Sequence, residues 1–349
     1  MDKNSAEKEI KVLGIDTGKN SFHLHGVDAE GHRVLRKHFN REKMLEFMVN
    51  LKPCLVGIEA CGGSHHLARK LMGMGHDVRI MAPQFVKPYV KSNKSDKLDA
   101  EAICEAVQRP NMRFVSIKST EQQDLQSLHR MRSMAVAHRT ALINQIRGLL
   151  MEYGIVLPKE PSYVRKQLPK LLEDTENGTT AELRGLLEQL REELVHMDER
   201  IDGYDAKVEV ISQQNESCKL LMSIPGIGPL IATAIIAAIG DVSMFKNGRE
   251  MAAWLGLVPR QHSTGGKITL LGISKRGDSY LRMLLVHGAR AALIHASKKN
   301  DRLSRWATEL EQRRGWNIAT VALAARNVRI AWALLSKKEA FKVSGVVHA

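Results

Sequence analysis

Two carboxylates stand three residues apart in the chain, at Asp96 and Asp99. In a helix this spacing places both side chains on one face, where the two anions repel each other unless a cation lies opposite them. Two interpretations are open at this point. Lys94 and Lys97 could neutralise the pair as ordinary surface ion pairs, or the pair could be half of a metal site.

Two further acids follow short apolar stretches that have the composition of buried strands. Asp16 follows the run 12–15, and Glu59 follows the similar run 55–58. Each pattern predicts a strand that presents a carboxylate at its C-terminal tip. Hard divalent cations such as Mg²⁺ take oxygen ligands. These two acids and the D-x-x-D pair together therefore predict a cage for Mg²⁺.

The elements that must position these acids form an α/β domain. In chain order we expect strands at 11–16, 21–27 and 32–39, a helix at 42–51, a strand at 54–59, a helix at 64–74 capped by Ser64, a strand at 77–81 and a helix at 94–108. This βββαβαβα order resembles the ribonuclease-H-like fold in its Holliday-junction-resolvase (RuvC-like) variety. In that fold a carboxylate pair on the last helix completes a two-metal site.

The segment 14–19 (G-I-D-T-G-K) has a competing interpretation. A D-x-G-x-K stretch after a strand also resembles the phosphate loop of actin-like sugar kinases. It does not match the P-loop pattern. Kinases of that fold repeat the motif in a second half, and this chain has no second copy.

A long helical middle follows the α/β domain. The stretch 121–152 places Leu125, Leu128, Met131, Met134, Leu142 and Leu149 on one side, and Pro158 and Pro161 end it. The stretch 187–211 has apolar residues at alternating steps of three and four, which is a heptad seam. Gly203 lies inside this seam and need not break the helix. The two helices could pair as an internal antiparallel coiled coil or across a dimer.

Positive charge is concentrated in the C-terminal third. Residues 241–349 hold 19 Lys and Arg against 7 Asp and Glu, a balance of +12 in a chain whose formal net charge is +14. Residues 161–215 hold 7 against 12, a balance of −5. This asymmetry indicates a surface that binds a polyanion such as nucleic acid.

Composition points to a cytoplasmic protein. A hydrophobic content of 44% suits a globular protein. The longest uncharged apolar run, 230–240, is about half of the ~20 residues that a membrane span needs. The start of the chain shows no apolar signal-peptide core, so we expect no membrane association. The four cysteines have no C-x-x-C spacing, which predicts reduced, mostly buried thiols.

Two glycine-rich segments in the basic third could contact phosphate. The turn Pro225-Gly226-Ile227-Gly228 resembles a helix-hairpin-helix element, whose backbone N–H groups hold a phosphate at a helix N-terminus. A plain connector between helices is the alternative. Residues 259–267 form a Gly-rich loop flanked by Arg260 and Lys267. Further cations that could bind nucleic acid follow at Lys275, Arg276 and Arg282.

Six motifs in their joint order resemble one family over nearly the whole chain. They are G-I-D-T-G-K at 14–19, I-E-A-C-G-G at 58–63, S-D-K-L-D-A at 95–100, P-G-I-G at 225–228, P-R-Q-H-S-T-G-G-K at 259–267 and G-I-S-K-R-G at 272–277. The family is that of the DEDD insertion-sequence transposases called one-ten, in particular its subgroup named after element eleven-eleven.

The resemblance implies a site and its partners. A resolvase-like domain (1–115) would supply Asp16, Glu59, Asp96 and Asp99, and a helical coiled-coil segment (116–217) would connect it to a mostly helical transposase domain (218–349). The last domain would supply a nucleophilic serine, which maps onto Ser263, with Thr264 beside it. The family further implies donor and target DNA, a structured bridge RNA, a dimer that assembles to a tetramer, and action at the nucleoid.

These features predict cutting and rejoining of DNA through a covalent phosphoserine, because metals held by the acids would neutralise phosphate oxygens and help to activate the hydroxyl. The acids and Ser263 are far apart in the chain, so the helical middle must return the serine to the first domain or lend it to a neighbouring subunit. A metal-dependent nuclease or junction resolvase that uses water is the alternative. A nucleic-acid-binding scaffold is the third possibility.

Overall fold

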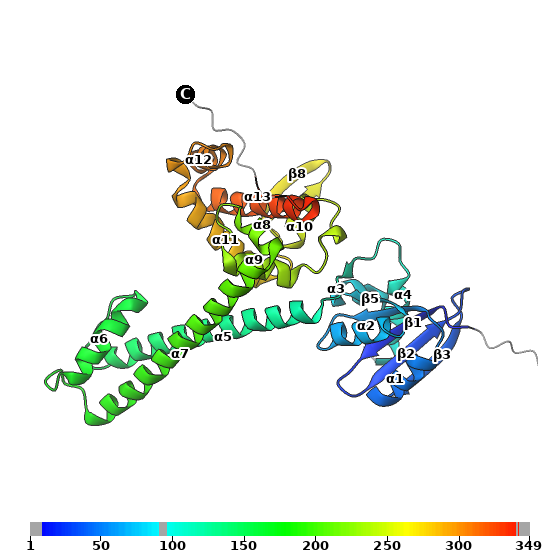
Figure 1. The fold of residues 1–349 in the computed structure, drawn as a ribbon, viewed down its shortest axis with the longest axis horizontal. Helices are drawn as coiled ribbons and strands as arrows, with labels where there is room; N and C mark the ends of the chain where they lie inside the picture. Colours follow the sequence, from blue (N-terminus) through cyan, green and yellow to red (C-terminus); the bar gives the residue numbers. More distant parts are fainter. Residues whose placement is uncertain (1–8, 91–95, 340, 342–349) are drawn as a thin grey trace, which may run out of the picture. The chain divides into compact units, whose positions relative to one another are not determined.

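The computed structural model describes residues 9–90, 96–339 and 341, and the chain divides into two compact units between Ser119 and Thr120 (Figure 1). Lys94 and Ser95 lie outside the described residues, as does the side chain of Lys97. The predicted pairing of Lys94 and Lys97 with the D-x-x-D acids therefore stays a prediction.

A six-stranded sheet forms the centre of the first unit. Its strands are β1 (Val12–Thr17), β2 (Phe22–Val27), β3 (Arg33–Phe39), β4 (Leu55–Glu59), β5 (Asp77–Met81) and β6 (Phe114–Val115), in the spatial order β3-β2-β1-β4-β5-β6. β1, β2 and β3 pair antiparallel, β4 joins β1 and β5 in parallel, and β6 pairs antiparallel with β5. The three antiparallel strands agree with the predicted meander, and the mixed sheet is consistent with a ribonuclease-H-like fold.

Helices cover both faces of this sheet. They are α1 (Arg41–Asn50), α2 (Ser64–Met72), α3 (Pro83–Val86), the 3₁₀ turn η1 (Lys87–Tyr89) and α4 (Asp96–Val107). Buried side chains of α1 and α2 pack with Leu13 and Ile15 of β1. Those of α4 pack with Val12 in a separate cluster. Because neighbouring residues of a strand point to opposite faces, α4 lies on the face opposite to α1 and α2.

The predicted elements of this unit all form, with two differences. Ser64 is not the cap of α2, because the N-cap is Gly63, whose φ of +89° is easy for glycine only. Ser64 Oγ instead donates to the carbonyl of Cys61 at 2.9 Å. The short elements β6, α3 and η1 were not predicted, since two to four residues are too few for a periodic pattern.

The second unit consists mainly of helices. They are α5 (Thr120–Met151), α6 (Pro161–Glu173), α7 (Ala181–Gln214), α8 (Glu216–Met222), α9 (Pro229–Ala238), α10 (Gly248–Trp254), α11 (Ser279–Ile294), α12 (Arg302–Arg314) and α13 (Trp316–Lys337), with 3₁₀ turns η2 (Val242–Met244) and η3 (Ala296–Lys298). A two-stranded sheet of β7 (Pro259–Thr264) and β8 (Lys267–Ile273) interrupts them.

The long helices α5 and α7 pack against each other within the chain, so the predicted internal coiled coil is confirmed (Figure 1). The seam of α7 is buried at Leu187, Leu194, Ile201 and Val208, and the helix runs through Gly203. Pairing across a dimer stays a prediction.

The predicted buried side of α5 is partly wrong. Met131 and Met134 are 40% and 61% exposed, whereas His129 and Ala135 are buried. At 100° per residue, Met131 points about 200° away from His129 and Met134 about 100° away from Ala135. The apolar methionines therefore lie off the line that faces α7.

One large apolar core joins α8 to α13. Among the described helices, α13 is the one long and apolar enough to cross a membrane by length and composition. Its residues Ala319, Leu323, Val328 and Ala331 are buried in this core. Three of the four cysteines, Cys54, Cys104 and Cys218, are buried free thiols and Cys61 is an exposed one, as predicted.

Candidate active site

Asp16 and Glu59 lie beside each other at the C-terminal ends of two neighbouring parallel strands. The register pairs Gly14 with Gly57 and Ile15 with Ile58. One further step along both strands brings Asp16 next to Glu59, and the two side chains share one face of the sheet. Both residues are half-buried. The strand tips predicted from the sequence therefore meet at one edge.

Two glycines bring α4 directly onto these strands. A Cβ atom on Gly14 would lie 2.2 Å from the carbonyl oxygen of Ala100 and 2.5 Å from the amide nitrogen of Cys104. A Cβ atom on Gly57 would lie 2.9 Å from Cβ of Val107. Since any side chain at either position would push the helix away, the glycines set its height above the sheet.

This contact fixes the D-x-x-D pair relative to the strands. Asp99 is half-buried and directly precedes Ala100, the residue over Gly14. Asp96 is the first residue of α4, and its side chain lies outside the described part of the chain. We call Asp16, Glu59, Asp96 and Asp99 the acid edge. A set of carboxylate oxygens on two strand ends and one helix suits a hard divalent cation.

Among the described side chains, the group of three metal-ligand residues whose ligand atoms lie close enough together to hold one ion is not the acid edge. Ligand atoms of Asp28, Glu30 and His32 lie within 4.8 Å of one another in the turn between β2 and β3. Glu30 and His32 are exposed, and Asp28 accepts a hydrogen bond from the His32 amide at 2.8 Å. This group is explained by the turn and is separate from the acid edge.

Two histidines lie in register with Asp16 on the next two strands of the sheet, and neither was predicted as a site residue from the sequence. His23 is the cross-strand partner of Asp16, so both side chains are on the face that carries α4. Its ring stacks on His38 at a centroid distance of 4.6 Å. His38 Nε2 is 2.7 Å from Ser21 Oγ. The period-two spacing of polar residues on the second strand is the sequence pattern that could have predicted His23.

Ser263 lies on a β-hairpin, whereas the sequence analysis expected a loop. β7 and β8 pair antiparallel and are joined by the two-residue turn Gly265-Gly266, with φ of +57° and +81°. A turn with positive φ at both positions matches the twist of the strands and requires residues such as glycine. We call 259–273 the serine hairpin. All of β7 is exposed.

The hairpin separates the two candidate hydroxyls. Ser263 Oγ accepts a hydrogen bond from Gln261 Nε2 at 2.8 Å. Thr264 Oγ1 is 3.4 Å from His262 Nδ1. Successive residues of a strand point to opposite faces. Ser263 and Thr264 are therefore presented to different partners.

Comparison with known proteins identifies the family. Residues 13–155 match a DEDD transposase family, and residues 218–304 match the family described as Transposase IS116/IS110/IS902. A probable family 20 transposase of Pseudomonas aeruginosa is 47% identical over 95% of this chain and 99% of its own length. The transposase for insertion sequence element IS1111A of Coxiella burnetii is 45% identical over 96% of this chain and 92% of its own. That of element IS1328 of Yersinia enterocolitica is 39% identical over 95% and 98%.

The chain belongs to the IS110/IS116/IS902 family of DEDD transposases.

Family membership establishes the broad activity. A transposase of this family cleaves DNA and transfers strands, and its DEDD domain implies dependence on a divalent metal. The resemblance found in the sequence motifs is thereby confirmed. The kinase-like interpretation of residues 14–19 is not supported, because Asp16 lies within the matched DEDD domain.

The base of the serine hairpin is clamped to the end of α10 in this transposase. Gly256, with φ of +70°, approaches so closely that a Cβ atom would lie 2.4 Å from Arg276 N. A Cβ atom on Gly277 would lie 2.1 Å from the carbonyl oxygen of Trp254. The Lys275 amide donates to Gly256 O at 3.1 Å. The hairpin therefore projects from a rigid foundation.

The predicted nucleic-acid contacts in this region divide into two groups. Arg260, Lys267, Lys275 and Arg276 are exposed. Arg282 instead donates from Nη1 to the carbonyls of Leu255 at 3.1 Å and Arg276 at 2.7 Å. These bonds give Arg282 a structural role in the hairpin base, so its binding of nucleic acid stays a prediction.

The P-G-I-G turn of the transposase joins α8 to α9. Gly226 has a φ of +86°, and a Cβ atom there would lie 2.3 Å from the carbonyl oxygen of Gly288 in α11. Close packing therefore explains Gly226. Gly228 is the N-cap of α9, and a Cβ atom there would meet nothing within 4 Å. An open hollow of about 570 Å³ borders the turn and is also lined by Lys299.

A buried polar network connects the coiled-coil helix α5 to α9 and α11. His129 of α5 lies 3.1 Å from Tyr280 Oη and 3.1 Å from Thr233 Oγ1. Arg132, one turn further along α5, bonds Asp205 of α7. Burial, with a smaller contribution from Arg132, lowers the pKa of His129 to about 4. His129 is therefore neutral at neutral pH, and its buried position makes the charged form unfavourable in the folded protein.

Proposed function

We propose that this transposase cuts and rejoins DNA through a covalent phosphoserine formed on Ser263, with two Mg²⁺ ions held by Asp16, Glu59, Asp96 and Asp99. The main support is the position of Ser263. Its hydroxyl is exposed on an ordered strand, close to a two-glycine tip and bonded to one neighbouring amide donor. A reactive group in this position can approach a phosphate without displacing packed side chains.

The proposed step conserves phosphoester bonds. Ser263 Oγ forms a bond to phosphorus, and the bond from phosphorus to the leaving strand breaks. The serine hydroxyl loses its proton, and the leaving oxygen takes one up. Rejoining reverses this step with the hydroxyl of a new strand and consumes no ATP.

The acid edge supports the metal part of the proposal. The glycine contacts beneath α4 set the distance between this helix and β1 and β4, the elements that carry the acids. Bound Mg²⁺ would neutralise phosphate oxygens and help to ionise the attacking hydroxyl. Ser263 belongs to the other unit of the chain, so we infer that the serine reaches the acids of its own chain or those of a neighbouring subunit.

We also infer the finer family features. The first unit would be of the RuvC-like variety, and the P-G-I-G turn would bind phosphate through backbone amides near Gly228, as a helix-hairpin-helix element does. Arg260, Lys267, Lys275 and Arg276 would contact donor DNA, target DNA or a structured bridge RNA. The protein would act as a dimer that assembles to a tetramer in the cytoplasm, at the nucleoid. The support is the exposed basic surface and the motif resemblance.

Trapping the intermediate tests the proposal. The transposase, Mg²⁺ and RNA transcribed from the noncoding DNA beside the gene would be mixed with a nicked suicide substrate, and the adduct would be located by mass spectrometry. We expect an adduct on Ser263 in the wild type and none in Ser263→Ala. Thr264→Val is the matched control and should keep the adduct, because its side chain is on the other face.

Two results would change the assignment. An adduct on Thr264 would move the nucleophile by one residue. Metal-dependent cleavage by Ser263→Ala at the wild-type rate, with no adduct on any residue, would show that water attacks and would favour the nuclease or resolvase alternative.

A further inference from the structure

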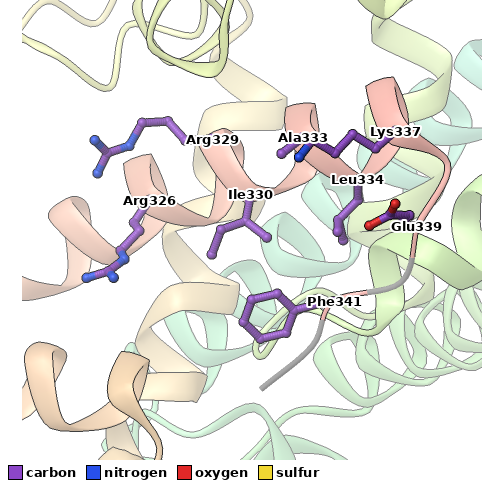
Figure 2. Close-up of a pocket in the computed structure, with 8 residues that line it drawn as sticks. All are labelled: Arg326, Arg329, Ile330, Ala333, Leu334, Lys337, Glu339 and Phe341. Carbon is purple, nitrogen blue, oxygen red and sulfur yellow. The ribbon is translucent and has the colours of Figure 1, made fainter. Parts of the chain in front are cut away.

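A pocket with an unusual combination of charge and apolar surface lies along α13 (Figure 2). Its volume is about 550 Å³. Arg326, Arg329, Ile330, Leu334 and Lys337 of α13 line it, together with Phe341 beyond the helix end. We call it the α13 pocket. These helix positions recur at steps of three and four, so they form one face, while the opposite face is buried in the core.

The cations that line the α13 pocket outnumber its lining acid by three to one. Within the part of the chain that the structure describes, none of the ion pairs involves Arg326, Arg329 or Lys337. Glu339 is the one acid among the lining residues, and it lies at the Lys337 end in Figure 2. Burial lowers the pKa of Arg326, and repulsion from Arg329 and Arg302 adds to this effect. Binding of an anion would relieve the repulsion.

Stacking on an aromatic ring holds the side chain of Arg326 in place. Its guanidinium carbon lies 4.3 Å from the ring centroid of Trp306 in α12. Stacking on an aromatic face restricts a long side chain that would otherwise lose rotamer freedom when it binds. The planar guanidinium is thus already ordered for two hydrogen bonds to a phosphate.

An apolar wall lies beside the cations. Figure 2 shows Ile330 and Leu334 directed toward the ring of Phe341. The Phe341 amide donates to Ser223 Oγ at the end of α8, at 3.1 Å, which anchors this residue to the unit. Phe341 is half-buried, so part of the residue remains accessible to a ligand.

We propose that the α13 pocket binds an unpaired nucleotide of single-stranded nucleic acid, with its phosphate at Arg326 and Arg329 and its base against Phe341. A volume of this size is within the range of small-molecule sites. Single strands are bound by cations that follow the backbone and by aromatic rings on which bases stack. A duplex satisfies only the first requirement, because its bases are stacked on each other inside the helix. This site is independent of Ser263 and of the acid edge.

Binding measurements on the full-length protein test the proposal. A labelled single strand of about 12 nucleotides, within the range that such sites cover, would be titrated in EDTA so that no cleavage occurs. Phe341→Ala should weaken binding about fivefold or more, since stacking contributes this much per base. Binding of a duplex of the same sequence should be unchanged. The control Ile318→Ala removes an apolar side chain that is 51% exposed on the same helix, and it should have no effect.

A second pair of variants isolates the charges. Arg326→Gln with Arg329→Gln should weaken single-strand binding more than Arg313→Gln with Arg314→Gln, which removes the same charge from exposed positions of α12. Circular dichroism would verify that each variant is folded. Photo-crosslinking of a 5-iodouridine strand should label the peptide that contains Phe341.

Two outcomes would overturn the proposal. One is equal affinity of Phe341→Ala and the wild type for the single strand, with crosslinks elsewhere. The other is an equal loss of single-strand and duplex binding, which would make the α13 pocket part of a general phosphate-binding surface.

Discussion

Asp16 and Glu59 lie on two central strands of a six-stranded sheet, with α4 pressed against their glycines. Ser263 lies on a two-stranded hairpin in which every residue of β7 is exposed. The backbone that carries the acid edge is positioned by the pairing of β1 with β4 and by the close approach of α4 to Gly14 and Gly57. The serine hairpin is fixed at its base and open at its tip.

This difference matches the demands on the two groups. Ligands of a metal must keep a narrow range of distances, so they belong on rigid elements. A nucleophile that is covalently joined to DNA must approach, react and withdraw while the strand is exchanged. In the proposed reaction, the first unit would contribute fixed geometry and the hairpin would contribute reach.

The acid edge should show the largest effect. Asp16→Asn, Glu59→Gln or Asp99→Asn should each lower the rate of strand cleavage by roughly three orders of magnitude, since a catalytic metal contributes several kcal/mol. The fold should persist. Asp77→Asn is the control, because Asp77 is an exposed acid of β5. Cleavage assays in Mg²⁺ and thermal melts measure the two properties. Wild-type cleavage by all three variants would refute the metal cage.

The second unit should lose stability in acid through the buried His129. His129 has a pKa of about 4 when folded and an ordinary one when unfolded, so the unfolded chain binds more protons between these values. Stability is then fully present above about pH 6.5 and falls by about 3 kcal/mol as pH drops toward 4. His129→Gln should flatten this dependence in urea titrations. The exposed His196→Gln should leave it unchanged, and an identical pH profile for both variants would contradict the assignment.

Glycine substitutions compare the two regions directly. Gly14→Ala should lower the free energy of unfolding by about 1–3 kcal/mol and also reduce cleavage, because the new methyl group meets the backbone of α4. Gly272→Ala in β8 meets nothing within 4 Å and should be almost neutral. Equal effects at both positions would show that α4 does not depend on the contact at Gly14.

Cations at the hairpin base should show the smallest effects. Lys275→Ala and Arg276→Ala should each reduce the slope of log affinity for DNA against log salt by about one, if each neutralises a phosphate. Arg282→Ala should leave the slope unchanged and instead lower the melting temperature, because its guanidinium is bonded to two carbonyls. A reduced slope for Arg282→Ala would restore the original expectation from the sequence.

The sequence predicted the first unit well because its signals are local. Apolar runs that end in an acid define β1 and β4, and the meander and α4 follow from periodicity. The contact of α4 with Gly14 was not predictable. It depends on a helix that begins about 80 residues later in the chain, and a glycine alone does not reveal what approaches it.

The second unit was harder to predict for physical reasons. The heptad seam of α7 was clear, but α5 contacts both α7 and α9, so its buried line includes His129 and leaves out Met131. The hairpin was interpreted as a loop because β7 carries no apolar residue between Arg260 and Thr264. The alternation of Ile268 and Leu270 with polar residues in β8 was the available signal, although both side chains are exposed. The pairing of Arg282 with carbonyls could not be told from a free cation by residue type.

If the proposed phosphoserine forms, the alternation of faces from Gln261 to Thr264 in β7 determines which hydroxyl can be the nucleophile. Deleting one residue between the irregularity at Pro259 and the tip would turn Thr264 to the side that Ser263 now occupies, whereas inserting two residues into the wild-type hairpin would leave Ser263 on its original side. The position of a residue in this alternation therefore determines which of the two adjacent hydroxyls is presented on a given face of the hairpin. Variants in hairpin length could thus read out which hydroxyl the reaction uses, without altering either side chain.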